Sequence, residues 1–108
     1  LGNILNIPIK NSSFDIIICV EALEHSLNPE KAINEMLRVL KKDGKIIIID
    51  KNIEKMGRME IEKFEQWFDQ YEIINLLKKE CLKIKCTSIE YDIYAADGLF
   101  LAWEAIKR

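Results

Sequence analysis

The sequence has few of the residues that mark several classes of protein. Among its 108 residues are one histidine and three cysteines, Cys19, Cys81 and Cys86, with no close cysteine pair of the kind found in zinc or redox sites. No apolar run approaches the roughly 20 residues that a membrane-spanning helix needs. No basic block or cationic leader is present, so we expect a cytoplasmic protein with reduced thiols and with no membrane or nucleic-acid partner.

Charge and length limit the remaining possibilities. Sixteen basic and eighteen acidic residues give a net charge of -2, which argues against strong attraction to a polyanion. The length suits one domain. The chain opens with Leu1-Gly2 instead of methionine, so we expect that a leader was removed or that the sequence is a piece of a longer protein.

Two short apolar runs predict strands. Phe14–Val20 and Lys45–Asp50 are β-branched and do not alternate, which is typical of strands buried on both faces of a parallel sheet. The segment between them predicts a helix, with Asn28 as its N-cap, Pro29 in its first turn and Gly44 as a left-handed stop. Strand, helix and strand at this spacing form a βαβ unit.

The second half predicts two helices and two strands. Apolar spacing favours helices around Ile61–Phe68 and Tyr71–Glu80. Residues 82–87 alternate and predict a strand with one wet face, and residues 99–106 predict a final strand. The order is βαβααββ, an α/β fold with a mainly parallel sheet that ends in an antiparallel pair.

Three consecutive motifs resemble a known family. Ile7–Asp15 resembles the "LPFxDxSFD" approach to the fourth strand of class I S-adenosylmethionine-dependent methyltransferases of the type 11 kind. Glu21–His25 resembles the "LEH" segment that follows that strand, and Asn28–Gly44 resembles "P…EMxRVLKPGG", with Lys42 and Asp43 where proline and glycine are usual. The resemblance covers roughly residues 3–50 and implies the C-terminal half of the Rossmann-like methyltransferase sheet.

The family's main cofactor-binding element is missing from these residues. The resemblance implies a glycine-rich turn after the first strand, whose backbone amides come close to the cofactor. It also implies an acid after the second strand, which binds the ribose hydroxyls. This sequence has four glycines, Gly2, Gly44, Gly57 and Gly98, and no clustered pair. We therefore expect residues 1–108 to form a single α/β domain, a truncated methyltransferase domain that lacks the N-terminal glycine-rich half.

The resemblance assigns four cofactor contacts. Asn3 falls where the family usually has an acid that accepts a hydrogen bond from the adenine amine, and an amide oxygen can also accept one. Ile4 follows, where a backbone amide would meet the adenine ring. Val20 and Glu21 lie at the carboxyl end of the first strand and would face the methionine part of S-adenosylmethionine. The alternatives are that Asn3 is a frayed terminal residue and that Glu21 is a solvated acid.

Glu21, Glu24 and His25 leave three interpretations open. Two carboxylates and an imidazole can bind a divalent cation, as in the related ubiquinone-pathway and small-RNA methyltransferases. His25 is the only histidine, so a nitrogen-rich metal site is excluded and we expect no metal. Glu24 and His25 can instead act as catalytic acid or base near the transferred methyl group. The third interpretation is that His25 only packs the loop before Asn28.

These observations lead to two functional hypotheses. The first is a fragment of a methyltransferase that transfers a methyl group from S-adenosylmethionine to a small-molecule acceptor and is inactive by itself. The second is a non-catalytic, methyltransferase-like remnant or interaction module. Without the missing half, the apolar strand Phe14–Val20 has an unpaired edge, so we expect the isolated chain to form a homodimer.

Overall fold

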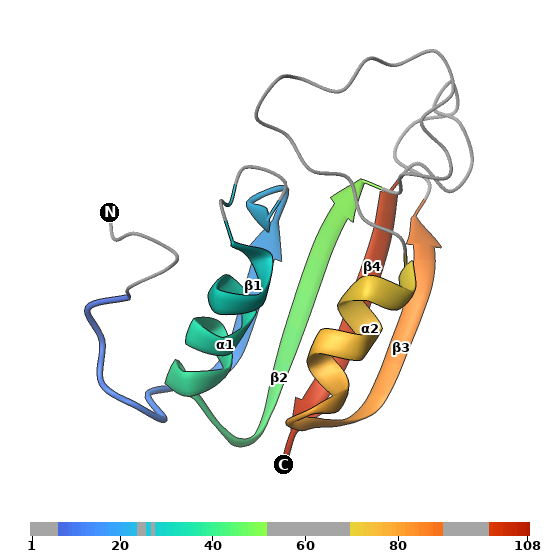
Figure 1. Ribbon diagram of the computed structural model, residues 1–108. Coiled ribbons are helices and arrows are strands. Elements are labelled where there is room, and N and C mark those ends of the chain that lie inside the picture. The colour runs from blue at the N-terminus through green and yellow to red at the C-terminus, as the bar shows by residue number, and fades with distance from the viewer. Residues whose placement is uncertain (1–6, 24–25, 27, 52–69, 90–99) are drawn as a thin grey trace.

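The computed structural model describes residues 7–23, 26, 28–51, 70–89 and 100–108. The described part is a four-stranded sheet with two helices on one of its faces (Figure 1). The sheet order is β1-β2-β4-β3. The elements are β1 (Phe14–Val20), α1 (Pro29–Val39), β2 (Leu40–Lys51), α2 (Gln70–Lys78), β3 (Cys81–Ile89) and β4 (Phe100–Lys107).

Strand pairing confirms the predicted α/β architecture. β1 and β2 are parallel, with Val20 opposite Ile49. β4 lies between β2 and β3 and is antiparallel to both, so the predicted closing antiparallel pair is present. The helix predicted around Tyr71–Glu80 corresponds to α2, whereas the helix predicted around residues 61–68 lies outside the described residues.

The start of α1 follows the sequence prediction, but its end does not. The Asn28 side chain accepts a hydrogen bond from the Lys31 amide (3.1 Å), and Pro29 is the first helical residue. The helix ends at Val39 and leads directly into β2, so the prediction of a left-handed stop at Gly44 is wrong. The Lys107 ammonium group, from β4, instead donates to the carbonyl oxygens of Leu37 (2.6 Å) and Leu40 (2.8 Å).

Gly44 is explained by close backbone approach. A Cβ atom at this position would lie 2.8 Å from the Lys41 carbonyl oxygen and 2.9 Å from the Asp15 carbonyl oxygen, closer than real contacts allow. The left-handed residue is its neighbour Asp43, with φ 65°. Gly44 therefore allows the bulged start of β2 to pack against β1.

The core lies between the sheet and its two helices. The inner face of β2 contributes Ile46 and Ile48, and α1 contributes Ile33 and Leu37, all fully buried. Trp103 of β4 is also fully buried, and its indole Nε1 donates to the Gln70 carbonyl oxygen (2.9 Å). This bond satisfies the one polar group of the indole and fixes the start of α2 against β4. No helix in the described ranges is long and apolar enough to cross a membrane.

The prediction that Phe14–Val20 is buried on both faces is wrong for this chain. Ile16, Ile18 and Val20 are 52%, 60% and 55% exposed, while the intervening Cys19 is buried. The physical reason is that both helices cover the same face and that β1 is the outermost strand of the described sheet (Figure 1). The run is apolar on both faces, but only one face has a covering layer.

The edge strand β3 is confirmed, with one change. A register shift between Leu82 and Lys85 adds one residue to β3, and Lys83 there has φ 53°. Plain alternation predicts that Leu82 and Cys86 share the buried face of β3. Because of the bulge they do not, and Leu82 is 51% exposed.

Candidate functional site at the carboxyl end of β1 and β2

Glu21 begins the candidate site because β1 ends immediately before it. Its backbone amide donates to the Ile49 carbonyl oxygen (2.8 Å), which continues the pairing with β2 by one residue. Glu21 has φ 52°, a left-handed conformation that costs a non-glycine residue about 1–3 kcal/mol. The chain thus turns sharply where open α/β sheets place their ligands.

A small pocket opens beside Glu21. It has a volume of about 180 Å³ and is lined by Val20, Glu21, Ile49, Ile89 and Phe100. Glu21 is the one polar residue among those that line it, and its carboxylate Oε1 lies 3.8 Å from the Lys51 ammonium group. This arrangement can hold an apolar group close to one carboxylate.

Val20 and Glu21, the predicted contacts to the methionine part of the cofactor, form one wall of this pocket, and the sequence did not predict the opposite wall. Ile49 is brought beside Val20 by the parallel register of β1 and β2. Phe100 and Ile89 face each other across the antiparallel pair β3–β4. Their side chains meet only because β4 inserts between β2 and β3, and no local pattern predicts that order.

Cys19 and Asp50 lie close to this end of the sheet on its buried side. Burial, with a smaller contribution from the Asp50 charge, raises the pKa of the Cys19 thiol to about 11. The thiol is therefore neutral at physiological pH, so Cys19 acts as a packing residue and not as a nucleophile. Asp50 is fully buried, and its carboxylate accepts a hydrogen bond from the Lys51 amide (2.9 Å).

An arginine on α1 holds the segment that enters β1. The Arg38 guanidinium donates to the carbonyl oxygens of Ile7 and Ile9 (both 2.8 Å) and to the Asn11 side chain (2.7 Å). Glu35 accepts from the same guanidinium and from the Ile7 amide (3.1 Å). The hydrogen bond from Arg38 holds the pKa of the Glu35 carboxyl below its ordinary value. Together the pair fixes the backbone that follows Asn3 and Ile4 in the chain.

The other predicted site residues fall outside the described residues. Asn3 and Ile4, the predicted adenine contacts, and Glu24 and His25, the predicted acid or base, are among them. Val20 and Glu21, which follow one another in the chain, both line the pocket at the carboxyl end of β1. Within the described ranges, no group of three histidine, cysteine, aspartate or glutamate side chains gathers as a metal site would require.

The pocket also tests whether these residues suit S-adenosylmethionine. Pockets that enclose a small-molecule ligand usually measure about 300–1,000 Å³, so a pocket of about 180 Å³ can take only one end of such a cofactor or its acceptor. Apolar walls with one carboxylate suit a methyl group carried on a cationic sulfur. The sequence of residues 1–108 has no clustered glycines of the kind that would form a turn to hold the rest of the cofactor.

Comparison with known proteins finds similar sequences for the first half of the chain. Residues 1–48 match the family model described as a methyltransferase domain. An uncharacterized protein of Methanocaldococcus jannaschii is 42% identical over 60 residues, which cover 56% of this chain and 26% of the relative. Norajmaline N-methyltransferase of Rauvolfia serpentina is 39% identical over 49 residues, which cover 45% of this chain and 17% of the relative.

Solved structures match nearly the whole chain. A SAM-dependent methyltransferase of Thermotoga maritima, described as a possible histamine N-methyltransferase, has a TM-score of 0.79 and 23% identity and is matched over 99% of this chain and 62% of its own. The N-methyltransferase NodS of Bradyrhizobium japonicum, in complex with S-adenosylhomocysteine, has a TM-score of 0.73 and 16% identity, with coverage of 98% and 52%. The chain thus spans at most about a quarter of these two curated relatives and less than two thirds of these solved chains.

Proposed function

This chain has the fold of a class I S-adenosylmethionine-dependent methyltransferase, and on that premise we propose that it forms the acceptor-facing part of an enzyme that methylates a small molecule. The observation that carries the proposal is the apolar pocket beside Glu21, at the carboxyl end of β1 and β2. Methyl transfer from a sulfonium needs an in-line approach and a dry site more than covalent help from the protein. The pocket walls Val20, Ile49 and Phe100 supply such a dry surface.

Each predicted residue has a role in this proposal. The backbone of Val20 and Glu21 borders the methionine end of the cofactor, and the Glu21 carboxylate attracts the cofactor's amine or an amine on the acceptor. Asn3 and Ile4 contact the adenine, and the Arg38–Glu35 pair positions the segment that follows them. Glu24 or His25 accepts or donates the acceptor's proton. No metal is needed for this scheme.

The cofactor would bind only when the glycine-rich half of the domain is present. The 108 residues hold the pocket wall, but their sequence has no cluster of glycines of the kind that forms the family's cofactor-binding turn. We propose that residues 1–108 form one α/β domain that is a partial methyltransferase domain, inactive alone. Three free thiols among the described residues and the near-balanced charge support a cytoplasmic protein that works without a membrane or nucleic acid.

The exposed row on β1 favours the second candidate function. A non-catalytic module that self-associates would use Ile16, Ile18 and Val20 as its contact surface, because a row of this kind is costly to leave in water. In this version the isolated chain is a homodimer.

Calorimetric titration of the 108-residue chain with S-adenosylhomocysteine tests the main proposal. We expect no tight binding by this chain, and micromolar binding by a version extended with an N-terminal glycine-rich half. In the extended protein, Glu21→Gln should weaken cofactor binding or acceptor turnover, with Lys42→Gln as the control at an exposed position. Unchanged binding and turnover in the Glu21 variant would remove the proposed role of this pocket.

A further inference from the structure

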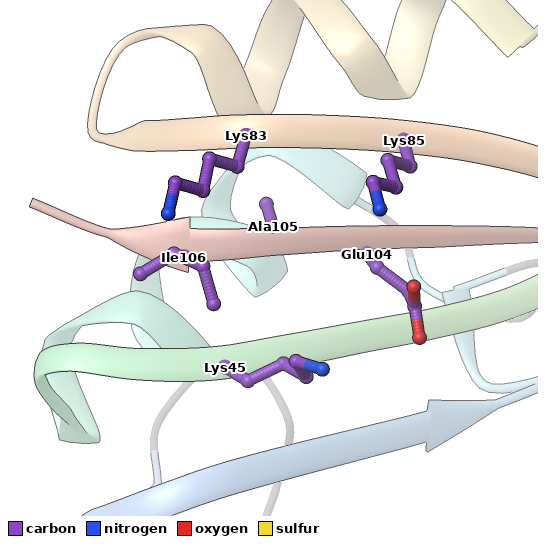
Figure 2. A pocket seen from close by; sticks show the side chains of 6 residues that line it. All are labelled: Lys45, Lys83, Lys85, Glu104, Ala105 and Ile106. Carbon is purple, nitrogen blue, oxygen red and sulfur yellow. The ribbon is translucent and has the colours of Figure 1, made fainter.

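Three lysines gather around β4, away from the pocket beside Glu21. Lys45 of β2 lies on one side of β4, and Lys83 and Lys85 of β3 lie on the other (Figure 2). Ile49, which lines the Glu21 pocket, is four positions further along β2 than Lys45, a separation of roughly 13 Å in an extended strand. The lysines therefore form a cluster separate from the pocket that we propose for methyl transfer.

The lysines border a depression over β4. Its volume is about 200 Å³, and it is lined by Lys45, Lys83, Lys85, Glu104, Ala105 and Ile106. Figure 2 shows Lys83 and Lys85 extending from β3 toward β4, and Glu104 extending from β4 toward β2. The backbones of β2 and β3 are two strand spacings apart, roughly 10 Å, so lysines from both sides can reach one anion between them. Pockets that enclose a drug-sized ligand usually measure about 300–1,000 Å³, so this depression suits a smaller one.

The charges of this depression do not balance. Among the described residues, no ion pair joins Lys45, Lys83 or Lys85 to a carboxylate. Glu104 is the one acid among the lining residues, so the three ammonium groups exceed it by two positive charges. Ammonium groups that line one small depression repel each other. A doubly charged anion between them would replace that repulsion with attraction.

The β-bulge places a strained residue in the depression. Lys83 has φ 53°, a left-handed conformation that suits glycine and not lysine. Protection of an open sheet edge explains a bulge and lysines on β3, because both discourage pairing with another strand. It does not explain Lys45, which lies on the interior strand β2. A lysine where the backbone favours glycine indicates a role for its ammonium group.

We propose that this depression binds a small soluble ligand with a doubly charged anionic group, of which a phosphate monoester is the simplest. The three ammonium groups would donate to its phosphate oxygens, as charge-assisted hydrogen bonds. Its organic part would lie against Ile106, which pairs with Leu82, itself 51% exposed. The site is additional to the proposed methyl transfer and does not depend on it.

A nucleic acid explains the depression less well. Nucleic-acid phosphates follow one another along a chain and are bound by several cations in succession, whereas these lysines surround one small depression. The net charge of the chain, -2, also opposes binding of a polyanion.

Titration of isotope-labelled 108-residue chain with phenyl phosphate and phenyl sulfate provides the test. The two probes are similar in shape, but near neutral pH the phosphate carries close to two negative charges and the sulfate carries one. We expect phenyl phosphate to bind about tenfold more tightly, to shift amide signals of residues 45, 83–85 and 104–106, and to lose affinity as salt concentration rises. Equal affinities, or shifts confined to α1, α2 or the Glu21 pocket, would overturn the proposal. So would binding to vesicles that contain phosphatidic acid without binding of phenyl phosphate.

Two variants should change the affinity in opposite directions. Glu104→Gln removes the negative charge of the depression and should tighten phenyl phosphate binding several-fold, a gain that damage to the fold cannot produce. Glu72→Gln, at an exposed position on α2, is the charge-matched control and should bind as wild type does. Lys83→Gly should weaken binding without lowering the urea midpoint, because glycine suits the left-handed backbone. A Glu104 variant that binds no more tightly than the Glu72 variant, or a Lys83 variant that binds like wild type, would contradict the proposal.

Lys45 separates ligand binding from edge protection. Lys45→Gln should weaken phenyl phosphate binding, whereas Lys10→Gln, at an exposed position before β1, should not. Equal affinities of these two variants would show that the lysines of β3 only protect the edge. None of these readouts involves the cofactor, so they fail independently of the titration with S-adenosylhomocysteine.

Discussion

Two adjacent residues at the start of β2, Asp43 and Gly44, differ in what their backbone positions require of the side chain. Gly44 has no room for a Cβ atom between the Lys41 and Asp15 carbonyl oxygens, whereas Asp43 has a left-handed φ that suits glycine. We expect Gly44→Ala to lower the free energy of unfolding by about 1–3 kcal/mol, because the backbone must shift. Asp43→Gly should leave it unchanged or slightly higher. Urea unfolding measures both, and equal effects of the two substitutions would contradict this account.

Cys19 gives stability a dependence on pH in the alkaline range. Its thiol has a pKa of about 11 in the folded chain against 9.0 for an exposed thiol. Between these values the unfolded chain loses the proton first, so the unfolded state binds fewer protons and stability falls as pH rises. A shift of this size corresponds to roughly 2–3 kcal/mol lost by pH 11.

In Cys19→Ala the free energy of unfolding should fall less steeply with rising pH than in wild type. The measurement is the urea midpoint between pH 8.5 and 11 for wild type and variant, where the free energy of unfolding tracks the midpoint at constant slope. Cys86→Ala is the comparison, because that thiol is only partly buried. If both variants lose stability as steeply as wild type, the buried thiol is not the source.

At the scale of elements, α1 depends on a strand remote in sequence. Lys107 of β4 donates to two carbonyl oxygens at the end of α1. Hydrogen bonds to a charged group contribute about 1.5–3 kcal/mol, so Lys107→Met should destabilise the chain by about that amount. Lys42→Met, at an exposed position, should have little effect on the urea midpoint. A Lys107 variant as stable as wild type would show that water replaces the lysine.

The Arg38–Glu35 pair connects α1 to the segment before β1. Arg38→Ala removes donors to Ile7, Ile9 and Asn11, so we expect faster hydrogen exchange at the backbone amides of residues 7–13. Amides in the middle of α1 should keep their protection, as they should throughout the chain in Asn34→Ala. Unchanged exchange before β1 in the Arg38 variant would contradict the assignment of this pair as a positioning unit.

The features that the sequence predicts correctly depend on residues close together in the chain, and the features that it misses depend on residues far apart in the chain. The start of α1 was predictable because the Asn28 cap and Pro29 act within one turn. The strands β1 and β2 were predictable from composition. The end of α1, the bulge at Lys83 and the pocket wall of Ile89 and Phe100 depend on β4, which comes from residues 100–107. Sequence motifs predicted Val20 and Glu21 as cofactor contacts, which stays a prediction, and no local signal indicated which residues lie opposite them.

At the scale of the whole molecule, the uncovered face sets the association behaviour. We expect the 108-residue chain to self-associate at high concentration through the β1 row when no other partner is present. Ile18→Lys, at the most exposed position of that row, should shift light scattering toward the monomer without lowering the urea midpoint. Tyr71→Lys, at an equally exposed position on α2, is the control. A chain that stays monomeric at high concentration would contradict this expectation.

The sheet order β1-β2-β4-β3 has a consequence for synthesis on the ribosome. β4 is made after β3, yet it is the strand that joins β2 to β3. Until β4 emerges, the edge of β2 that pairs with β4 and the whole of β3 have no hydrogen-bonding partner in this sheet. Nascent chains with such unpaired strand edges attract chaperones. Assembly of these four strands therefore waits for the sheet's last-made strand, and pausing of translation before residue 100 should prolong the vulnerable interval.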